Sequence, residues 1–536
     1  MNLVRSDEAV RGLGRYRAVM LPRTRLARLV LALSTAVGLA TLAACGTTLS
    51  KSDSRGFAAP GAQDANLGGA SGTTASTPAS RDATAASTGQ GTGLGATSPS
   101  AGNVQGASAA ATGSASGTTD TRSSLPSGSL VAPQGPGVTA TTVNVGLVYS
   151  SDAAAGDAAI GAAGASAGDT RTYYTAMANY LNAHGGLAGH RISILWFDVK
   201  TASAETVEQQ EQSACAFWTQ DHKVLALPGG NDILNACAEK AHAFAVGVGS
   251  EVSSTFQKYP HYVDPVSFRI DRLGPVTVNG LDSQKYFAGK LGLVTWDDPN
   301  YVFAMQHGYA PALAAKHIAY RDVAYIGVPQ TLGAVSDMSA AVRSAIVKFQ
   351  SEGIDHVIVQ DGPAGVWAGT GLTFEWFNQA KSQHYYPRYG MNSYNSPGWS
   401  VLPADQQHGG LAVTWADNDP SYDAGWKVNQ ARVACFKIMN DAGVTVNGSN
   451  LNAEGVAAGA CDIFSVMKLA LDHAPNLTAD GFIAGVNQLT RGFPSALVYG
   501  THLSPTQHDG GDKVRNSYFD DACSCMKFTG APYSPT

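Results

Sequence analysis

Beyond residue 45, this chain of 536 residues has no apolar stretch long enough to cross a membrane. It also lacks a Cys-x-x-Cys pair, a histidine at zinc-ligand spacing and a phosphate-binding Gly-x-x-x-x-Gly-Lys motif. Charged residues make up only 14% of the chain, and the formal net charge is -6. No basic surface of the kind that binds nucleic acid is therefore expected, nor is a cofactor.

The N-terminus has the layout of a secretory signal, because three arginines precede an apolar stretch at 29–44. That stretch has about 16 residues, fewer than the roughly 20 of a spanning helix. It ends in Leu-Ala-Ala-Cys-Gly, which resembles the lipobox of bacterial lipoproteins. The resemblance implies cleavage before Cys45, lipidation of its thiol and an extracytoplasmic protein held on the outer face of the cell membrane. An uncleaved membrane anchor is the alternative, and Met20 rather than Met1 is a candidate start.

Residues 46–137 consist almost entirely of Gly, Ala, Ser and Thr. Such a segment buries too little apolar surface to offset the entropy lost on ordering. As a random coil it would span on the order of 50 Å. We expect a disordered tether between the membrane and a folded part of about 400 residues, enough for two domains.

Six cysteines besides Cys45 can form three disulfides in an oxidising compartment, and the sequence alone allows 15 connectivities. Pairing neighbours along the chain closes two short loops, each stabilising by about 3 kcal/mol, whereas a Cys-x-Cys ring is strained and the weakest candidate. The rival interpretation is a zinc site. The favoured pairs are Cys215–Cys237, Cys435–Cys461 and Cys523–Cys525.

The folded part opens with the β-branched run 142–149, which is typical of a strand buried on both faces. A helix with Asp169 as its N-cap follows, and strands and helices then alternate, which predicts a parallel sheet. The further strands of this series are expected at 191–198, 224–227 and 244–248.

A second series of strands starts near Gly274, and two long helices follow it, at 422–441 and 453–473. The sequence therefore predicts an α/β protein with two doubly wound parallel-sheet units in tandem. The strands of this series are expected at 291–295, 323–328, 356–360, near 390 and at 411–415.

Several stretches resemble the leucine/isoleucine/valine-binding family of type I periplasmic solute-binding proteins. The clearest is 180–198, Tyr-Leu-Asn-Ala-His-Gly-Gly-Leu-Ala-Gly-His-Arg-Ile-Ser-Ile-Leu-Trp-Phe-Asp, a helix, a Gly-Gly turn and a strand ending in Asp. The run 137–146 is similar to the family's opening, and 294–301 stands where its second lobe starts. The Cys215–Cys237 spacing is similar to that of its first-lobe disulfide.

The resemblance implies two lobes joined by a multi-strand hinge that close on a small polar solute, such as an amino acid, an amide or a carboxylate-like molecule. It implies a monomer without enzymatic activity, whose partners are the solute and the permease of an ABC importer. Lobe one would be 138–270 with 421–500, and lobe two would be 271–420 with 501–528.

Ligands of open α/β sheets bind beyond the carboxyl ends of the strands, where glycines and small polar residues give access to the backbone. The resemblance places the ligand at such loops in both lobes, with Trp296 and Trp367 as possible stacking partners. The candidates in lobe one are Ser150, Ser151, Gly230, Asn231, Ser250 and Glu251, and those in lobe two are Asp361, Asn392 and Tyr394.

Two features depart from the family's amino-acid binders. The segment around Asn392 lacks the acidic residue that pairs with the ligand's ammonium group, and the Glu251 carboxylate would repel a ligand carboxylate. Both weaken the case for an α-amino acid.

Two other functions compete with import. A sensor or scaffold of the same fold would signal to a protein partner, and adjacent permease and ATPase genes rather than a kinase gene would argue against it. An exported hydrolase rests on Gly164-Ala-Ser-Ala-Gly168, but a nucleophile elbow must follow a strand directly, and this motif follows a long loop. The loop holding His502, His508, Asp509 and Asp512 is expected to be solvated rather than metal-binding.

Overall fold

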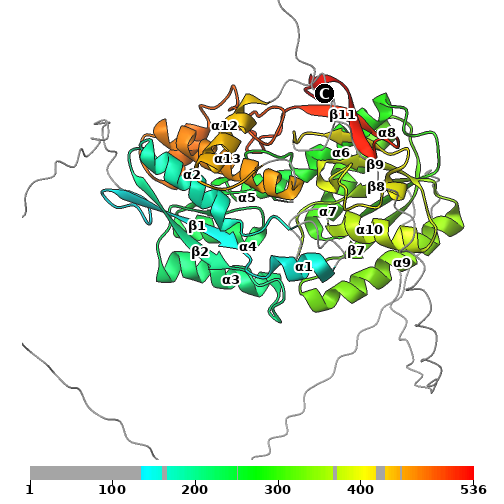
Figure 1. Ribbon diagram of the computed structural model, residues 1–536, viewed down its shortest axis with the longest axis horizontal. Helices are drawn as coiled ribbons and strands as arrows, with labels where there is room; N and C mark the ends of the chain where they lie inside the picture. The colour runs from blue at the N-terminus through cyan, green and yellow to red at the C-terminus, as the bar shows by residue number, and fades with distance from the viewer. Residues whose placement is uncertain are drawn as a thin grey trace, which may run out of the picture. The chain divides into compact units, whose positions relative to one another are not determined.

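The computed structural model describes residues 134–159, 166–249, 251–365, 371–417, 429–446 and 450–535. The expected signal, Cys45 and the tether up to residue 133 lie outside this range. Within it the chain forms two β-sheets, each with helices on both faces (Figure 1). No helix in this part of the chain has the length and apolar character needed to cross a bilayer.

The first sheet is entirely parallel and has the strand order β2-β1-β3-β4-β5. Its longest pairing is between β1 and β2, where eight residues pair in register, and Val143 and Val145 of β1 are buried. The strands are β1 (Thr142–Tyr149), β2 (Arg191–Asp198), β3 (Ala226–Pro228), β4 (Phe244–Val246) and β5 (Tyr262–Val263).

Helices cover both faces of this sheet (Figure 1). One group is α2 (Arg171–Ala183), α12 (Gln430–Asp441) and α13 (Leu451–Asp472), which pack on one another. The other group is α3 (Val207–Ala216), the π-helix η1 (Phe217–Asp221) and α4 (Asp232–Ala241). The remaining helices of this part are α1 (Ala153–Ala159), α5 (Ser253–Lys258) and α14 (Ala479–Val486).

Close packing ties these helices to the strands. The Trp218 side chain lies so near β1 that a Cβ on Gly146 would come within 2.8 Å of its ring. On β4, the Phe244 ring stacks on Phe482 of α14 with centroids 3.7 Å apart. The disulfides are the favoured ones: Cys215–Cys237 joins α3 to α4, Cys435–Cys461 joins α12 to α13, and Cys523–Cys525 lies near the C-terminus.

The second sheet is mixed and has the order β12-β11-β10-β9-β8-β6-β7. Five strands are parallel, and an antiparallel hairpin, which the sequence analysis missed, extends the sheet beside β10. The strands are β6 (Leu291–Asp297), β7 (Tyr320–Gly327), β8 (His356–Gln360), β9 (Arg388–Asn392), β10 (Leu411–Thr414), β11 (Val514–Asp520) and β12 (Cys525–Tyr533).

The helix α6 (Ile270–Ser283) packs on β9 and β10, whereas α9 (Val335–Glu352) packs on α10 (Gly371–Ser382) and β7. The other helical segments here are short. They are α7 (Pro299–Ala304), η2 (Met305–Tyr309), α8 (Ala310–Ala315), η3 (Leu332–Ala334), η4 (Ser393–Asn395) and α11 (Ala404–Gln407).

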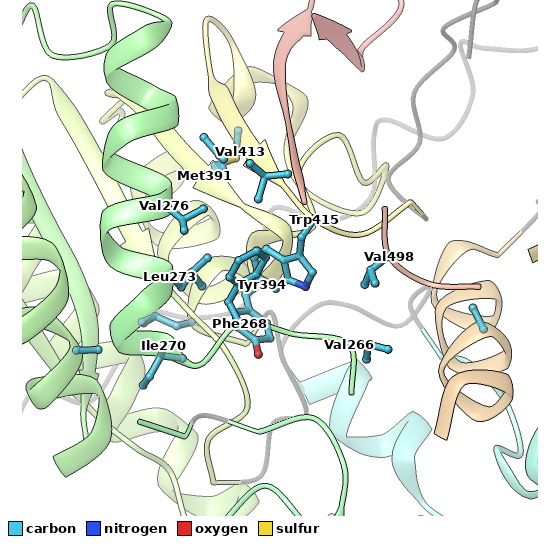
Figure 2. Close-up of a cluster of buried hydrophobic side chains, with 14 of the residues drawn as sticks. Val266, Phe268, Ile270, Leu273, Val276, Met391, Tyr394, Val413, Trp415 and Val498 are labelled. Atoms are coloured by element: carbon cyan, nitrogen blue, oxygen red, sulfur yellow. The ribbon is translucent and has the colours of Figure 1, made fainter. Parts of the chain in front are cut away.

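In the part of the chain that the structure describes, three crossing segments lie between elements of the two sheets: 264–269, 415–417 and 499–511. They are bonded to one another or to their neighbours, as in the backbone bridges Asp264–Asp509 and Ala416–Val498. Figure 2 shows apolar side chains of these segments gathered with those of α6, β9 and β10. The Trp415 ring lies edge-on to Phe268, 5.8 Å away, and to Tyr394, 5.0 Å away.

The expected cap at Asp169 is present: its carboxylate accepts from the backbone N–H of Arg171 at 3.1 Å, and Thr170 between them already has a helical conformation. The same carboxylate accepts from the Arg171 side chain, the shortest bond being 2.7 Å. One expectation from the sequence is wrong. The loop around Asp509 is not solvated, since Asp509 is 1% exposed and bonded to arginines of the first crossing segment and α6.

Candidate functional site

Loops at the carboxyl ends of strands in the two sheets contact one another. The Asn300 amide at the start of α7 donates to the Glu251 carboxylate at 3.4 Å, and the Tyr394 hydroxyl donates to the Gly249 carbonyl at 3.3 Å. The backbone N–H of Val207 donates to the Gln330 carbonyl at 3.0 Å. The candidate site therefore lies where the strand ends of both sheets meet, beside the crossing segments.

The loop after β1 is held by the loop after β2. Asp152 accepts from the backbone N–H groups of Thr201 and Ala202 at 2.8 and 3.0 Å, and from the Ser150 hydroxyl at 2.9 Å. Burial raises the pKa of Asp152, but these hydrogen bonds outweigh it, and the net pKa lies below the ordinary value. Asp152 is thus ionised and holds the loop after β1 to the loop after β2. Its carboxylate also orients the Ser150 hydroxyl toward itself.

Ser151 is exposed at the same loop and sits beside an ion pair. Its hydroxyl accepts from the Lys200 ammonium, which also pairs with Asp198 at 2.5 Å. Its backbone N–H donates to Asp198 at 3.0 Å. The hydrogen bond that Lys200 donates to Asp198 raises the pKa of Lys200, so this loop carries a cation next to an accessible hydroxyl.

The loops after β3 and β4 touch through their glycines. Gly230 has φ +112°, which favours glycine, and a Cβ on Gly249 would come within 2.2 Å of the Gly230 Cα. Asn231 caps α4 by accepting from Leu234 N–H at 2.8 Å, and its amide donates to Glu211 at 3.0 Å. Asn231 is half-buried, and part of its hydrogen-bonding capacity is already used by Leu234 and Glu211.

Two carboxyl groups flank these loops, the half-buried Glu211 and the buried Glu251. Burial raises the pKa of both Glu211 and Glu251 to about 7. Glu251 is 1% exposed and accepts from the Asn235 amide at 2.9 Å. Near neutral pH each of these groups exchanges readily between its charged and neutral forms.

Asp361, after β8, is fully buried and accepts four hydrogen bonds. Its donors are Trp296 Nε1 at 3.2 Å, Gly362 N–H at 2.8 Å, and the backbone and hydroxyl of Thr373 at 2.7 and 2.8 Å. Burial raises the pKa of Asp361 to about 7. Its acceptor capacity is taken up by the protein, so it fixes the loop after β8 to α10.

Asn392, the last residue of β9, and Tyr394 just after it are also buried. Asn392 caps η4, accepting from Tyr394 N–H at 2.9 Å, and its backbone N–H donates to Asn395 at 2.7 Å. Burial raises the pKa of the Tyr394 phenol, which stays protonated and donates to Gly249 and to the Ser267 hydroxyl. These residues lock the strand end against the first crossing segment.

The sequence did not indicate Asn235 and Asn300, the two amides that bind Glu251. Asn300 follows Asp298, which accepts from its N–H at 2.9 Å as the N-cap, and Pro299 stands at the first helical position. This capping signal places Asn300 at the end of β6, and the strand-end rule would have found it. Ser250 and Trp367 lie outside the described residues.

The geometry supports neither of two alternative functions, a serine hydrolase and a metal-binding protein. Ser166 accepts from the N–H of Gly168 at 3.2 Å, as a turn residue does, and part of its motif lies outside the described residues. Within the described part of the chain, no group of three or more His, Cys, Asp or Glu side chains is arranged to hold a metal ion.

No protein-family model matches the sequence, and no curated protein matches it either. Solved structures do match. A branched-chain amino acid ABC transporter protein from Thermus thermophilus with bound valine aligns with a TM-score of 0.52 at 12% identity, over 74% of this chain and 97% of its own. A possible leucine/isoleucine/valine-binding protein from Rhodopirellula baltica aligns with a TM-score of 0.51 at 13% identity, over 73% and 96%.

A solute-binding protein of an ABC transporter from R. palustris, in complex with 4-hydroxybenzoate, aligns with a TM-score of 0.51 at 13% identity, over 74% of this chain and 97% of its own. At such low identity these likenesses concern the fold, and they cover nearly the full length of each of these proteins. The chain has the two-sheet α/β fold of type I periplasmic solute-binding proteins of the leucine/isoleucine/valine-binding kind.

Proposed function

We propose that this protein captures a small polar solute outside the cytoplasm and delivers it to an ABC importer. The observation that carries the proposal is the meeting of strand-end loops from both sheets, as in the Glu251–Asn300 and Tyr394–Gly249 contacts. Loops in this position are the usual ligand site of open α/β sheets. The proteins of this fold named above are parts of ABC transporters or branched-chain amino acid binders.

The mechanism we propose is closure of two lobes about the crossing segments 264–269, 415–417 and 499–511. Lobe one comprises 138–270 and 421–500, and lobe two comprises 271–420 and 501–528. A solute that contacts both lobes binds the closed form more tightly than the open form, and it therefore shifts the population toward closure.

The candidate residues divide into two groups by burial. Ser150, Ser151, Gly230 and Asn231 are exposed or half-buried, and we propose that they contact the solute, together with Ser250. Glu251, Asp361, Asn392 and Tyr394 are buried and already bonded to the protein, and we propose that they hold the loops in position. Their role in binding is then indirect, through the geometry of the loops.

The charged groups at the site limit which class of solute can bind. Glu211 is bonded to Asn231, and Glu251 lies just beyond Gly249, so an incoming carboxylate at the loops after β3 and β4 would meet two acidic groups. Lys200 is a compensating cation that we assign to the site, beside the loop after β1. We therefore rank neutral amides and other uncharged polar solutes above α-amino acids, with an aromatic acid as the next class to test.

A thermal-shift panel of short amides, amino acids, carboxylates and aromatic acids tests this proposal. A solute at a hundred times its Kd should stabilise the protein by about 2.7 kcal/mol. Ser151→Ala should reduce that stabilisation, whereas Ser344→Ala, on the exposed face of α9, should not. A well-folded sample that no solute stabilises would rule the proposal out.

The anchor and the partner are separate parts of the proposal. Lipidation of Cys45 would hold the protein on the outer face of the membrane, and Cys45→Ser should abolish labelling with a fatty acid and cleavage before residue 45. A serine variant that is still labelled and still cleaved there would contradict this. Co-purification of the wild-type protein with a permease supports import, and co-purification with a membrane kinase would favour the sensor alternative instead.

A further inference from the structure

The turn of the hairpin between β11 and β12 carries the disulfide Cys523–Cys525, whose cysteines are separated by two positions. The other two disulfides have separations of 22 and 26 and join pairs of helices. A cross-link stabilises mainly by closing a loop in the unfolded chain, and a loop this small removes little entropy. Stabilisation by loop closure therefore does not account for the Cys523–Cys525 disulfide.

The hairpin is closed without this disulfide. Asp520 and Cys525 are paired in the β11–β12 ladder, and the side chains of Asp520 and Lys527 form an ion pair. Within the turn, Ala522 N–H donates to the Asp520 carboxylate at 2.8 Å, and Cys523 N–H donates to its carbonyl at 3.3 Å. Opening the sulfur–sulfur bond would leave these contacts in place.

The surroundings of the two sulfurs differ. Cys523 is exposed, whereas Cys525 is 3% exposed, and β12 is the outer strand of its sheet. Ser524 between them has φ +49°, a left-handed conformation that is unfavourable for a residue with a Cβ. An exposed disulfide in a small ring is the kind that exchanges with thiols, while bonds between helices in a core resist them.

We propose that Cys523–Cys525 is a thiol-exchange site, with Cys523 as the sulfur that is attacked. The co-reactant is a thiol, RSH, from a small molecule or an unfolded peptide. Its thiolate bonds to the Cys523 sulfur, the Cys523–Cys525 bond breaks, and the electron pair leaves on the Cys525 sulfur, which takes a proton from water. A second thiolate attacks the R sulfur of the mixed disulfide, which forms RSSR and releases the Cys523 thiolate.

Two electrons thus pass from two thiols to the protein disulfide, and the thiols are oxidised. This activity is independent of solute binding and of the lipid anchor. The buried Cys525 serves as the leaving group in the first step, and it can re-form the ring by attacking a mixed disulfide on Cys523 in the reverse direction.

The test is equilibration of the full-length wild-type protein, purified without refolding, with mixtures of reduced and oxidised glutathione. Acid quenching, alkylation and peptide mass mapping then give the redox state of each cysteine pair. We expect Cys523 and Cys525 to become reduced at a thiol excess about tenfold or more below that needed for the other two disulfides. Reduction of all three together, or of Cys523–Cys525 last, would overturn the proposal.

The matched variants Cys525→Ser and Cys523→Ser test which sulfur reacts. With oxidised glutathione, the free Cys523 of the first variant should form a mixed disulfide about tenfold faster than the free Cys525 of the second. Equal rates, or the reverse order, would contradict the assignment. If a variant fails to fold, peptide mass mapping of the wild-type protein still decides whether Cys523–Cys525 exchanges with thiols before the other disulfides.

A second arm replaces glutathione with an unstructured peptide that contains one cysteine. Faster exchange with the peptide identifies protein thiols as the co-reactant, and faster exchange with glutathione identifies small thiols. If neither exchanges with Cys523, the proposal is wrong. Solute-induced thermal stabilisation, measured on the same samples, reports separately on the proposed import function.

Discussion

Two buried carboxyl groups, those of Asp361 and Asp462, are stabilised by neutral hydrogen-bond donors rather than by cations. Asp361 accepts from Trp296, Gly362 and Thr373, and Asp462 on α13 accepts from Ser495 at 2.5 Å and from the backbone beyond it. Burial raises the pKa of both to about 7. Each of these two residues joins a helix or strand end to a segment distant in sequence. Replacing one oxygen atom of the carboxyl group should therefore change the geometry of the attached loop.

Asp361→Asn should destabilise the protein by about 2–4 kcal/mol. The amide keeps the shape of the side chain but puts an N–H₂ group against donors, so one or more of the Gly362 and Thr373 groups loses its acceptor. Urea unfolding at neutral pH measures the change. The control is Asp405→Asn, which breaks only an exposed pair with Lys381 and should change stability by less than about 1 kcal/mol. Equal effects of the two substitutions would refute this role for Asp361.

Glu251 should make stability depend on pH. Burial raises its pKa from 4.5 to about 7, so between these values the folded state holds a proton that the unfolded state has lost. The free energy of unfolding therefore falls as pH rises from about 4.5 to 7. Glu251→Gln lacks this titration, and relative to wild type it should gain about 2–3 kcal/mol between pH 5 and pH 8.

Urea unfolding of wild type and Glu251→Gln at both pH values measures that gain. The comparison isolates one group, because the other buried carboxyl groups, Asp361 and Asp462 among them, are present in both proteins. A difference between the two proteins that stays constant from pH 5 to pH 8 would show that Glu251 keeps an ordinary pKa. The control is Glu352→Gln, at the half-buried last residue of α9, which should show no such gain.

At the scale of helices and strands, the sequence predicted what buried apolar runs determine. The strand 142–149 and the strand 356–360 have the expected bounds, because a run of β-branched residues between turn signals leaves little choice. The hairpin β11–β12 was missed, since Val514–Asp520 is largely polar and its turn, Asp-Ala-Cys-Ser, lacks glycine, proline and asparagine.

The candidate site was predicted at the level of loops but not of contacts. Strand-end topology placed residues 150–151, 230–231 and 392–394 correctly at the ends of β1, β3 and β9. The sequence did not reveal that Glu251 would accept hydrogen bonds from Asn235 and Asn300, because those partners are 16 and 49 residues away and depend on how two loops pack. Tertiary packing, rather than local sequence, thus determines which polar groups remain free to bind a solute.

The crossing segments are held together by a buried carboxylate whose partners are cations. Asp509 accepts from Arg269 N–H at 3.1 Å and forms ion pairs with the side chains of Arg269 and Arg272, the latter at 2.6 Å. Arg272 also lies over the Phe268 ring at 4.3 Å. The segment 499–511 is thereby joined to the segment 264–269 and to α6.

Asp509→Asn should destabilise the protein by about 3 kcal/mol or more, because it leaves two half-buried guanidinium groups facing a neutral amide. Denaturant unfolding measures the loss. The matched control is Asp441→Asn, which removes an exposed ion pair with Lys437 on α12 and should have an effect below about 1 kcal/mol. If Asp509→Asn were as mild as the control, the ion pairs would not hold the crossing segments.

At the scale of the whole molecule, function in our proposal depends on contacts between the two lobes that form and break. One of them, from Val207 N–H to the Gln330 carbonyl, joins the start of α3 to the loop after β7. Val207 is the first residue of α3, a position where proline is favoured and where no hydrogen bond within the helix is lost. Thr206 before it, at φ -68° and ψ 159°, already has a conformation compatible with a following proline.

Val207→Pro should therefore remove this contact and leave α3 intact, with an unchanged circular dichroism spectrum. Loss of one hydrogen bond of about 1 kcal/mol should shift the equilibrium about fivefold toward the open form and weaken solute affinity by up to that factor. Small-angle scattering should show a larger radius of gyration without solute, and a similar radius to wild type at saturating solute. Val207→Ala, which keeps the N–H, should behave as wild type. A proline variant with wild-type affinity and radius would mean that closure does not involve this contact.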